Sequence, residues 1–339
     1  MNKLQKEFEK FHNSIKADEV SALREKRDKL KKDIEESFPE KCKKVGIEIK
    51  KSDLRFINQG SYKIGTTISS EHVDLDYAVI FPLDIEEYSD PRVLKKAARD
   101  SLLIANVRIP EIKEPCVTVA YHRNGEEYMH IDFPLYAEKG SQLYLARGKE
   151  FSQNYEWEKA DPEGLSAYFI DQFSGNDQLK RIVRYIKKWK QVKYGNSRNT
   201  NEVPPSVGLT LLACENYVSF TNDENDDLSS LYYTMKNIKN KFTITTDSEG
   251  NIVDATINCD LPVCPYSDVF YKLRNSTTHM ITFYKRVCKA VENLLEAINL
   301  SEEHEAAKYV VKVLGDEFEI PPKKANETST SNKKEYCFG

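Results

Sequence analysis

Residues 58–81 constrain the fold of this chain more than any other stretch. They extend from the end of one run rich in Phe, Ile, Val and Tyr, at 54–58, to the end of another, at 75–81. The composition of both runs predicts β-strands. The polar turn between the runs begins Gly60-Ser61. A strand that ends at Gly-Ser and opens a short helix directs several backbone N–H groups at one point, and a glycine lets a phosphate approach that point. We therefore predict a triphosphate-binding turn formed by Gln59, Gly60 and Ser61.

Two aspartates lie at the start of the second run. Asp74 and Asp76 are two residues apart, so both carboxylates lie on one face of an extended segment. Adjacent carboxylates repel one another unless a cation lies between them, and hard oxygen ligands are those that Mg²⁺ prefers. The pair therefore predicts metal-assisted phosphoryl transfer, with both aspartates as catalytic residues and metal ligands. The alternative for an isolated Asp-x-Asp is a solvated strand end.

A third carboxylate is expected on a later strand. The runs 116–121 and 128–136 flank Arg123-Asn124-Gly125-Glu126, which is a hairpin signal. In the second run, His130 and Asp132 share the face opposite to the apolar residues Met129, Ile131 and Phe133. Two metal sites about 3.5–4 Å apart need a further carboxylate to hold both the attacking hydroxyl and the leaving pyrophosphate. Asp132 is the predicted third metal ligand and catalytic residue.

The order Gly60-Ser61, Asp74-x-Asp76 and then Asp132 resembles the active-site pattern of the polymerase-β-type nucleotidyltransferase superfamily. Within it, the chain most resembles the cGAS/DncV-like nucleotidyltransferases (CD-NTases) of bacterial anti-phage (CBASS) operons. The resemblance covers most of the chain and implies an α/β (α+β) fold: a catalytic lobe with a mixed, mostly antiparallel sheet, and a mostly helical C-terminal lobe. It also implies two Mg²⁺ ions, with Mn²⁺ able to substitute, and condensation of ribonucleoside triphosphates into a cyclic di- or trinucleotide messenger.

Four segments are expected: N-terminal bracing helices over 1–50, the catalytic lobe over 51–150, the helical lobe over 151–319 and a disordered tail over 320–339. Apolar residues at helical spacing predict helix over residues 3–37, broken near residues 16–18 with an N-cap at Asp18. A further helix over 93–106 is expected to cover the sheet. The polar stretch 138–171, which contains Gly140, Gly148 and Pro162, is predicted to be a connector between the lobes.

Residues 179–193 are predicted to form a helix with one apolar stripe. Lys180, Arg184 and Lys187 fall along one flank of the stripe, whereas Arg181 and Lys188 point away from it. Flanking cations can lay their stems on the core and extend their charges into a cleft. Arg184-x-x-Lys187-x-Trp189 also resembles the helix that supplies a triphosphate-contacting lysine in the family, which implies this role for Lys187, with Arg184 as a helper. The alternative is an ordinary solvated basic face.

Residues 204–212 resemble the next helix start in oligoadenylate synthetases and their bacterial relatives. Ser206 there either contacts a phosphate or nucleobase or only caps the helix. A hairpin is predicted over 242–246 and 252–258, and the last helices over 269–300 and 302–314.

The chain ends in a polar tail whose last residue is Gly339. The resemblance implies that a ubiquitin-transfer-like enzyme joins Gly339 to targets, as in many antiviral operons. The alternative is a tail without this role, because a terminal glycine is weak evidence.

The composition describes a globular protein, with 40% hydrophobic and 31% charged residues. No apolar run is long enough to span a bilayer and the N-terminus lacks a signal peptide's apolar core, so we predict a cytoplasmic protein. The seven cysteines are scattered, which suits a reducing compartment, and Cys259, Cys264 and His279 have poor spacing for zinc.

The formal net charge of −4 argues against a general nucleic-acid coat, although small triphosphates need only a local basic patch. The expected partners are ribonucleoside triphosphates, ATP among them, the ubiquitin-transfer-like enzyme, and an effector reached through the cyclic nucleotide. Neither a membrane nor an obligatory nucleic acid is expected. Three alternatives are a template-independent RNA or linear oligoadenylate polymerase, a transferase that modifies a protein or small molecule, and a degenerate scaffold.

Overall fold

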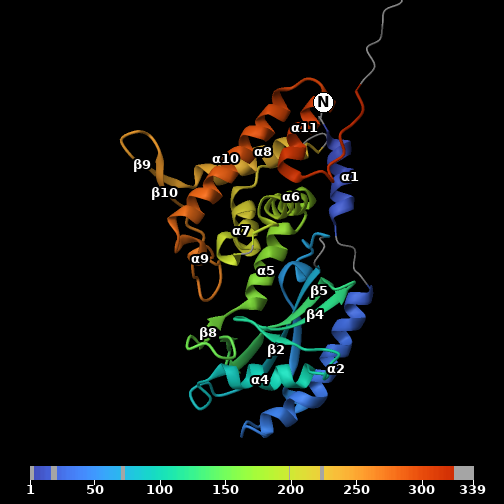
Figure 1. Cartoon of the computed structure of the whole chain (residues 1–339), viewed down its shortest axis with the longest axis vertical. Coiled ribbons are helices and arrows are strands. Elements are labelled where there is room, and N and C mark those ends of the chain that lie inside the picture. Colours follow the sequence, from blue (N-terminus) through green and yellow to red (C-terminus); the bar gives the residue numbers. More distant parts are fainter. Residues whose placement is uncertain (1–3, 17–20, 70–72, 198, 222–224, 324–339) are drawn as a thin grey trace, which may run out of the picture.

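The computed structural model describes residues 4–16, 21–69, 73–197, 199–221 and 225–323. The described chain forms two lobes along its longest axis, a lower lobe built on a sheet and an upper lobe of helices, with α5 (Pro162–Phe173) running between them (Figure 1). The predicted class, a mixed sheet with a helical C-terminal region, is confirmed. The four segment boundaries stay predictions. Gly339, most of the predicted disordered tail and the N-cap expected at Asp18 lie outside the described residues.

The two N-terminal helices brace different lobes. α1 (Gln5–Ile15) buries Phe8 and Phe11 against α6 and α8 of the upper lobe. α2 (Ser21–Lys43) packs along α4 in the lower lobe. α2 was predicted to end at residue 37 but continues through Pro39. The continuation follows one fully buried stripe at four-residue spacing, whose apolar burial offsets the hydrogen bond that the proline removes: Leu30, Ile34, Phe38 and Cys42.

The lower lobe contains a sheet of eight strands in the order β3-β4-β5-β2-β6-β7-β8, with β1 also paired to β2. β2 runs parallel to β5 and β6, and the other pairs in this sheet are antiparallel. The strands are β1 (Arg55–Asn58), β2 (Val73–Pro82), β3 (Glu111–Ile112), β4 (Val117–Arg123), β5 (Glu126–Phe133), β6 (Leu135–Lys139), β7 (Gln142–Arg147) and β8 (Glu156–Ala160). The predicted hairpin at Asn124-Gly125 is the turn from β4 to β5.

The prediction of a polar connector over 138–171 was wrong. This stretch contains the end of β6, then β7, β8 and most of α5. β8 was not predicted because it lies at the edge of the sheet and has no fully buried residue, so its sequence lacks an apolar pattern. Its one large apolar residue, Trp157, is anchored by its indole N–H, which donates to the Tyr88 carbonyl at 2.8 Å.

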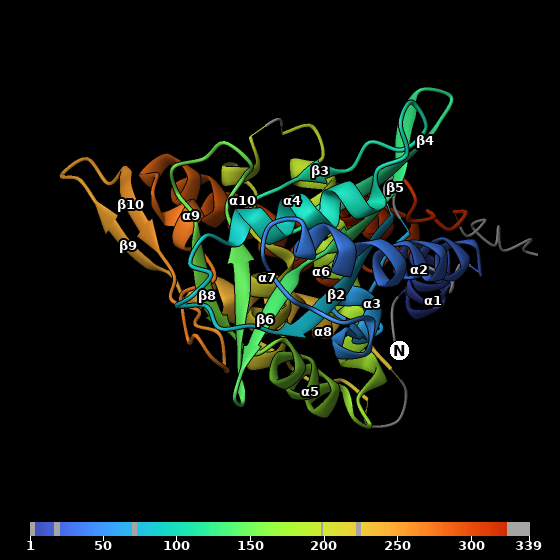
Figure 2. The ribbon, with the colours of Figure 1, turned by 90° about the horizontal axis from the view of Figure 1, so that it is seen from below.

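α4 (Pro91–Leu102) and α2 lie over one face of the sheet, as Figure 2 shows from below. The Asp90 side chain caps α4 by accepting from the Arg92 N–H at 2.9 Å. Leu94, Ala98 and Leu102 are fully buried toward the sheet, so the predicted cover is confirmed. The helix ends at Leu102 instead of residue 106, because Leu103 is extended and Ile104 pairs with Arg108 in an isolated bridge.

In the upper lobe, α6 (Asp177–Tyr194) is surrounded by other helices, which are α7 (Ser206–Asn216), α8 (Asp227–Asn240), α10 (Thr277–Asn299) and α11 (Glu303–Leu314) (Figure 1). The predicted helix over 179–193 and the hairpin of β9 (Thr243–Thr246) and β10 (Ile252–Thr256) are confirmed. The helix expected over 269–300 is instead α9 (Tyr271–Arg274) and α10, separated at Asn275-Ser276.

The two α6 cations that were predicted to point away from the apolar stripe both have carboxylate partners. Arg181 Nε lies 2.7 Å from Asp227 Oδ2, and Asp227 is fully buried. Lys188 Nζ lies 2.5 Å from Glu317 Oε1. α6 is therefore packed on nearly every side, which the sequence pattern of one stripe did not predict. Within the described residues, none of the helices is both long enough and apolar enough to cross a bilayer.

Candidate active site

The register between β2 and β5 brings the acidic residues together. In this parallel pair Asp74 lies beside His130, and Asp76 lies beside Asp132. Because alternate residues of a strand share a face, all four side chains lie on one face of the sheet. Leu75 and Ile131 lie on the opposite face and are fully buried.

His130 lies at the centre of this group. Its Nε2 is 3.1 Å from Asp74 Oδ1 and 3.8 Å from Asp132 Oδ2, and its Nδ1 is 2.9 Å from Glu127 Oε1. The hydrogen bond to Asp74 is the largest cause that raises the pKa of His130 to about 9. The imidazolium form therefore offsets part of the negative charge at this end of the sheet.

Asp132 is fixed by the neighbouring strand. Thr118 of β4 lies opposite Asp132 in the antiparallel register, and its hydroxyl donates to Asp132 Oδ1 at 2.5 Å. The Asp132 side chain is only 15% exposed, whereas that of Asp74 is 54% exposed. The more buried carboxylate is thus held by a hydroxyl, and the more exposed one faces the solvent.

Asp76 lies against the phosphate-binding turn. Gly60 has a φ of +59°, and a Cβ at this position would overlap Asp76 Oδ2. Burial, followed by the charges of Asp74 and Asp132, raises the pKa of Asp76 to about 8. Its ionised form therefore needs a nearby positive charge, which a bound cation would supply.

The residues present fit a divalent cation. Asp74, His130 and Asp132 each offer one ligand atom, and these atoms lie within 4.8 Å of one another. Carboxylate oxygens suit Mg²⁺ and Mn²⁺, and an imidazole nitrogen suits the transition metal better than Mg²⁺. Divalent metal use is supported, while Asp76 as a ligand and the presence of two ions stay predictions.

His130 was missed as a site residue. The sequence placed it on the same face as Asp132, and this alternation was the available signal. Its pairing with Asp74 depends on the parallel register of β2 and β5, which joins segments more than fifty residues apart in the chain.

The turn after β1 forms the short helix α3 (Gly60–Lys63), as predicted. The Ser61 hydroxyl lies 3.2 Å from the Thr67 hydroxyl, and the Ser61 carbonyl accepts from the Thr66 N–H at 2.9 Å. The Gln59 side chain is buried, with its Nε2 3.2 Å from the Tyr136 hydroxyl. Gln59 therefore anchors the turn to β6 inside the lobe, and its predicted contact with a nucleotide stays untested.

α6 brings two predicted cations to this turn. Lys187 Nζ lies 3.0 Å from Thr66 Oγ1 and 3.2 Å from the Thr66 carbonyl, and the Arg184 guanidinium donates to the Gly65 carbonyl. Burial, followed by the charges of Lys190 and Arg184, lowers the pKa of Lys187 to about 7. Both side chains are 7% exposed, and neither forms an ion pair with a carboxylate in the described part of the chain.

Ser206 is the first residue of α7, as predicted, and follows the N-cap residue Pro205. Its hydroxyl oxygen accepts from Lys190 Nζ at 2.7 Å. This bond connects Ser206 to α6, and its predicted contact with a phosphate or nucleobase stays a prediction.

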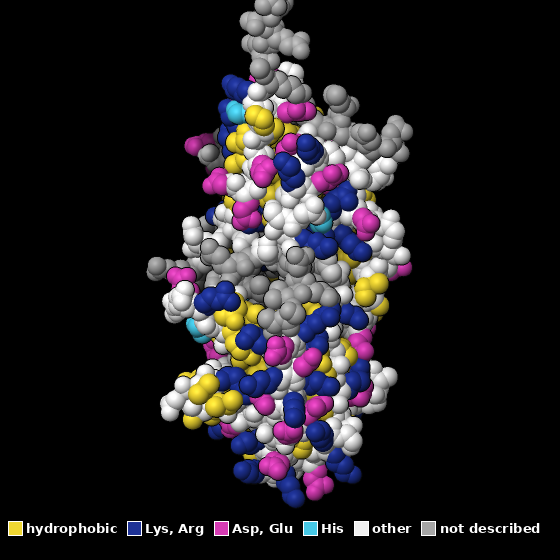
Figure 3. Space-filling view, turned by 90° about the vertical axis from the view of Figure 1, so that its right-hand side faces the viewer, with side chains coloured by type: hydrophobic (Ala, Val, Ile, Leu, Met, Phe, Trp, Pro, Cys, Tyr) yellow, Lys and Arg dark blue, Asp and Glu magenta, His cyan; other side chains and the backbone are white. Residues whose placement is uncertain are grey.

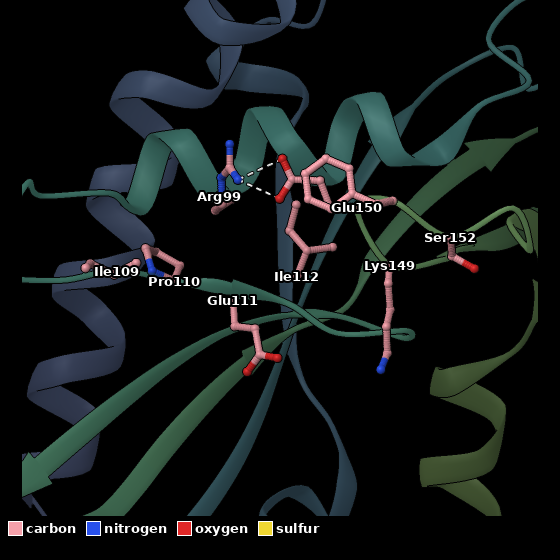
Figure 4. A pocket seen from close by; sticks show the side chains of 9 residues that line it. Arg99, Ile109, Pro110, Glu111, Ile112, Lys149, Glu150 and Ser152 are labelled. Carbon is pink, nitrogen blue, oxygen red and sulfur yellow. Dashed lines mark hydrogen bonds and ion pairs between the residues drawn. The ribbon is translucent and has the colours of Figure 1, made fainter.

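Two pockets lie away from the acidic group. The larger has a volume of about 560 Å³ and lies below α4 (Figure 4). Arg99 and Glu150 pair at its rim, and its apolar lining includes Ile109, Pro110 and Ile112. The smaller, of about 190 Å³, lies between the end of α6 and the start of α10. Neither is lined by a residue that the sequence analysis assigned to the site.

The catalytic lobe is similar to known nucleotidyltransferase domains. Residues 54–136 match the model of the nucleotidyltransferase domain described as cyclic GMP-AMP synthase DncV-like. This segment is similar to that family. It includes the phosphate-binding turn and all three predicted aspartates, whereas Lys187 and Ser206 lie outside it. The predicted resemblance to cGAS/DncV-like nucleotidyltransferases is confirmed.

A curated relative, the cyclic GMP-AMP synthase of Escherichia albertii, is 26% identical over 186 residues, which cover 51% of this chain and 39% of the relative. The chain thus spans well under half of that relative's length.

Solved structures share the DncV-like fold over nearly the whole chain. The Bradyrhizobium diazoefficiens CD-NTase CdnG in complex with GTP has a TM-score of 0.67 at 14% identity, covering 91% of this chain and 95% of CdnG. Escherichia coli DncV in its 3'-deoxy GTP bound form has a TM-score of 0.65 at 15% identity, covering 93% and 92%. Vibrio cholerae DncV in complex with the linear intermediate pppA(3',5')pG has a TM-score of 0.62 at 18% identity, covering 93% and 85%.

Proposed function

We propose that this chain is a metal-dependent nucleotidyltransferase that condenses ribonucleoside triphosphates into a cyclic di- or trinucleotide and releases pyrophosphate. The observation that carries the proposal is the placement of Asp74, Asp76 and Asp132 on one face of β2 and β5, beside the turn at Gly60. The buried cations of α6 reach the same turn from the other lobe. A cyclic product is supported by the cyclic GMP-AMP synthase relative, and triphosphate substrates by CdnG with GTP.

Each part of the site has a task in this reaction. Backbone N–H groups at the start of α3 and the Lys187 ammonium bind the triphosphate and orient it for in-line attack. Asp74, Asp76 and Asp132, with His130 beside them, would hold the divalent ions, which when bound stabilise the charge that develops on the transferring phosphoryl group. Asp132, which accepts a hydrogen bond from the Thr118 hydroxyl, would help to activate the attacking ribose hydroxyl by accepting its proton. The new bond joins that hydroxyl oxygen to the α-phosphorus, and pyrophosphate leaves.

Further parts of the proposal concern the cell. We place the enzyme in the bacterial cytoplasm, where its product would reach an effector in anti-phage defence. Gly339 would be the point at which a ubiquitin-transfer-like enzyme joins the chain to targets. These proposals come from the family resemblance.

The alternative is a template-independent polymerase that extends RNA or makes linear oligoadenylate. Such an enzyme needs a continuous basic track for a polynucleotide. On the face shown in Figure 3, Lys and Arg side chains are interspersed with Asp and Glu, and the whole chain has a net charge of −4. This distribution favours small triphosphates over a polynucleotide.

The test is to incubate the protein with all four ribonucleoside triphosphates and Mg²⁺ or Mn²⁺, treat the products with phosphatase and analyse them by mass spectrometry. The Asp74→Asn/Asp76→Asn double variant is the control. We expect a phosphatase-resistant oligonucleotide without free ends that is absent in the control. Linear products would favour the polymerase alternative, and near-normal turnover of an Asp76→Asn variant would refute the site assignment, because loss of one such carboxylate costs on the order of thousandfold in rate.

A further inference from the structure

A small cavity in the upper lobe lies between the end of α6, the short 3-10 helix η2 (Thr200–Glu202) and the start of α10. Its volume is about 190 Å³. Six residues line it, and none of them belongs to the candidate active site: Tyr194, Glu202, Thr278, His279, Thr282 and Arg286. Drug-sized ligands fill pockets of roughly 300–1,000 Å³, so this cavity suits a molecule smaller than a nucleotide.

The first turn of α10 brings backbone donors to the cavity. The helix begins without a side-chain cap at Ser276. The Ser276 carbonyl accepts from the N–H groups of His279 and Met280, at 3.0 and 3.2 Å, whereas those of Thr277 and Thr278 have no partner among the described residues. The positive end of a long helix with two free N–H groups attracts an anion. Water can also satisfy such groups, so the helix start alone does not indicate a ligand.

Two side chains of the cavity supply independent evidence. The Tyr194 hydroxyl and His279 Nδ1 are buried, and neither has a hydrogen-bond partner within the described part of the chain. Tyr194 belongs to α6 and is only 5% exposed. Native proteins seldom leave such buried polar atoms unpaired. Both atoms can carry a proton and donate it, so together they indicate a ligand that accepts hydrogen bonds.

Arg286 gives the cavity a positive charge. Its guanidinium Cζ lies 3.9 Å from the centroid of the Tyr194 ring, and it forms no ion pair with a carboxylate among the described residues. Thr278, Thr282 and Arg286 repeat at four-residue spacing, so they follow one another along one side of α10. A guanidinium, hydroxyl donors and the N–H groups of a helix start together suit a phosphate group.

Glu202 brings a carboxylate to the same cavity. Its Oε1 accepts from Asn199 Nδ2 and its Oε2 accepts from the Ser197 hydroxyl, both at 3.1 Å, and its side chain is 46% exposed. Solvent and these contacts weaken its repulsion of an anion. The remaining lone pairs of the carboxylate can accept from a hydroxyl group of a ligand. A phosphate-binding end and a hydroxyl acceptor fit two parts of one small molecule.

We propose that this cavity binds a small hydroxylated phosphate monoester, with its phosphate group between Arg286, the Tyr194 hydroxyl and the start of α10. The site is separate from the turn at Gly60 and from the aspartates of the lower lobe. A ligand bound there would connect α6, η2 and α10, so it would stabilise the upper lobe.

The experiment measures the binding of glycerol 3-phosphate, inorganic phosphate and glycerol to the full chain by isothermal titration calorimetry, and the shift in melting temperature that each causes. The variants are Arg286→Met, Tyr194→Phe and Lys285→Met. Lys285→Met is the matched control, because Lys285 is an exposed cation beside Arg286 on α10 and does not line the cavity. Unfolding without ligand checks that each variant is folded. Each titration is repeated with saturating α,β-methylene-ATP and Mg²⁺, which would occupy the candidate active site.

We expect glycerol 3-phosphate to bind more tightly than inorganic phosphate, and glycerol not to bind. Arg286→Met and Tyr194→Phe should each weaken the binding of glycerol 3-phosphate by about tenfold or more, as for a lost hydrogen bond to a charged group. Lys285→Met should bind it within about twofold of the unmodified protein, and α,β-methylene-ATP should not compete. Tyr194→Phe should not lower the melting temperature of the ligand-free protein, because it removes a hydroxyl without a partner.

Three results would overturn the assignment: no binding of glycerol 3-phosphate, equal affinities in Arg286→Met and Lys285→Met, or tighter binding of inorganic phosphate than of the ester. Competition by α,β-methylene-ATP would place the phosphate in the candidate active site and overturn a separate site. A lower melting temperature of ligand-free Tyr194→Phe would show that the fold already satisfies the hydroxyl, which would overturn its role as a donor to the ligand. None of these measurements depends on turnover, so the proposed function can fail without affecting this site.

Discussion

At the residue scale, Gly60 is required by both its conformation and its neighbour. Replacement by alanine would place a Cβ in the left-handed region and against the Asp76 carboxylate. Gly65 is the matched control, because its φ of +68° is similar and a Cβ there would meet nothing within 4 Å. We expect Gly60→Ala and Gly65→Ala each to lower the free energy of unfolding by about 1–2 kcal/mol. Only Gly60→Ala should also abolish turnover, which denaturant unfolding and product assays would show. Similar turnover in the two variants would contradict this.

Lys187 makes nucleotide affinity depend on pH. Its folded-state pKa of about 7 lies below the ordinary lysine value. Lys187 is therefore fully protonated only at lower pH, and it loses its proton as the pH rises above 7. A polyanion needs the ammonium form, so triphosphate affinity should fall as the pH rises above 7. In Lys187→Arg the guanidinium stays charged over this range, so the fall in affinity above pH 7 should be absent. Titrations of a non-reacting analogue from pH 6 to 9 measure both curves. Parallel curves would show that Lys187 does not face the phosphates.

His130 should affect the choice of metal. Its Nε2 lies between the carboxylates of Asp74 and Asp132. Imidazole is a better ligand for Mn²⁺ than for Mg²⁺, so His130→Gln should lower the activity with Mn²⁺ more than the activity with Mg²⁺. The measurement is a titration of turnover with each metal. An equal loss with both would indicate that His130 positions Asp74 without ligating the ion.

At the element scale, the sequence predicted those strands and helices whose periodicity is strong. β2, β4 and β5 have apolar faces that alternate with polar ones, and α6 has a clear stripe. β8 was missed because charged residues surround Trp157 at the edge of the sheet, where little burial is needed, whereas β7 was missed although its residues 143–146 form an apolar run. α8 was not predicted, although Leu228, Leu231 and Met235 repeat at helical spacing and are buried. The pairing of β2 with β5 could not be predicted, since register depends on contacts between distant segments.

The packing of α6 depends on a buried carboxylate at the start of α8. Asp227 accepts from Arg181, Gln178 and the Tyr185 hydroxyl, and its own N–H donates to Gln5 of α1. Asp227→Ala would leave the Arg181 charge buried without a partner, which should lower the free energy of unfolding by about 3–5 kcal/mol.

The matched control for Asp227→Ala is Asp177→Ala. Asp177 also lies near a cation of α6, but its side chain is 90% exposed, so its loss should cost less than about 1 kcal/mol. Urea unfolding of both variants measures the difference. Equal costs would show that the Asp227 cluster does not stabilise the upper lobe.

At the scale of the whole molecule, the lobes are connected on two sides of the site. On one side α6 donates to the carbonyls of Gly65 and Thr66. On the other, Glu114 of the lower lobe accepts from Lys272 of α9 at 2.8 Å and also pairs with Arg147. These links join residues more than one hundred positions apart, such as 114 and 272, so no local sequence pattern indicates them. They nevertheless decide how the turn at Gly60 and the cations of α6 face a common ligand.

The pair of Glu114 and Lys272 therefore bears on nucleotide affinity, although neither residue belongs to the site. A triphosphate must contact both lobes, so a variant that loosens one link lowers the fraction of molecules ready to bind. The side chains are 38% and 46% exposed, so the pair contributes at most about 1 kcal/mol and Lys272→Met should weaken analogue binding by no more than about fivefold. Lys289→Met is the control, because Lys289 pairs with Glu292 within α10 and should have no effect. The difference in analogue affinity between the two variants should shrink at high salt. Salt screens the exposed pair of Glu114 and Lys272 in the unmodified protein, so removing the pair then changes less. If both variants bind like the unmodified protein at low salt, α6 and the turn hold the lobes together without this pair.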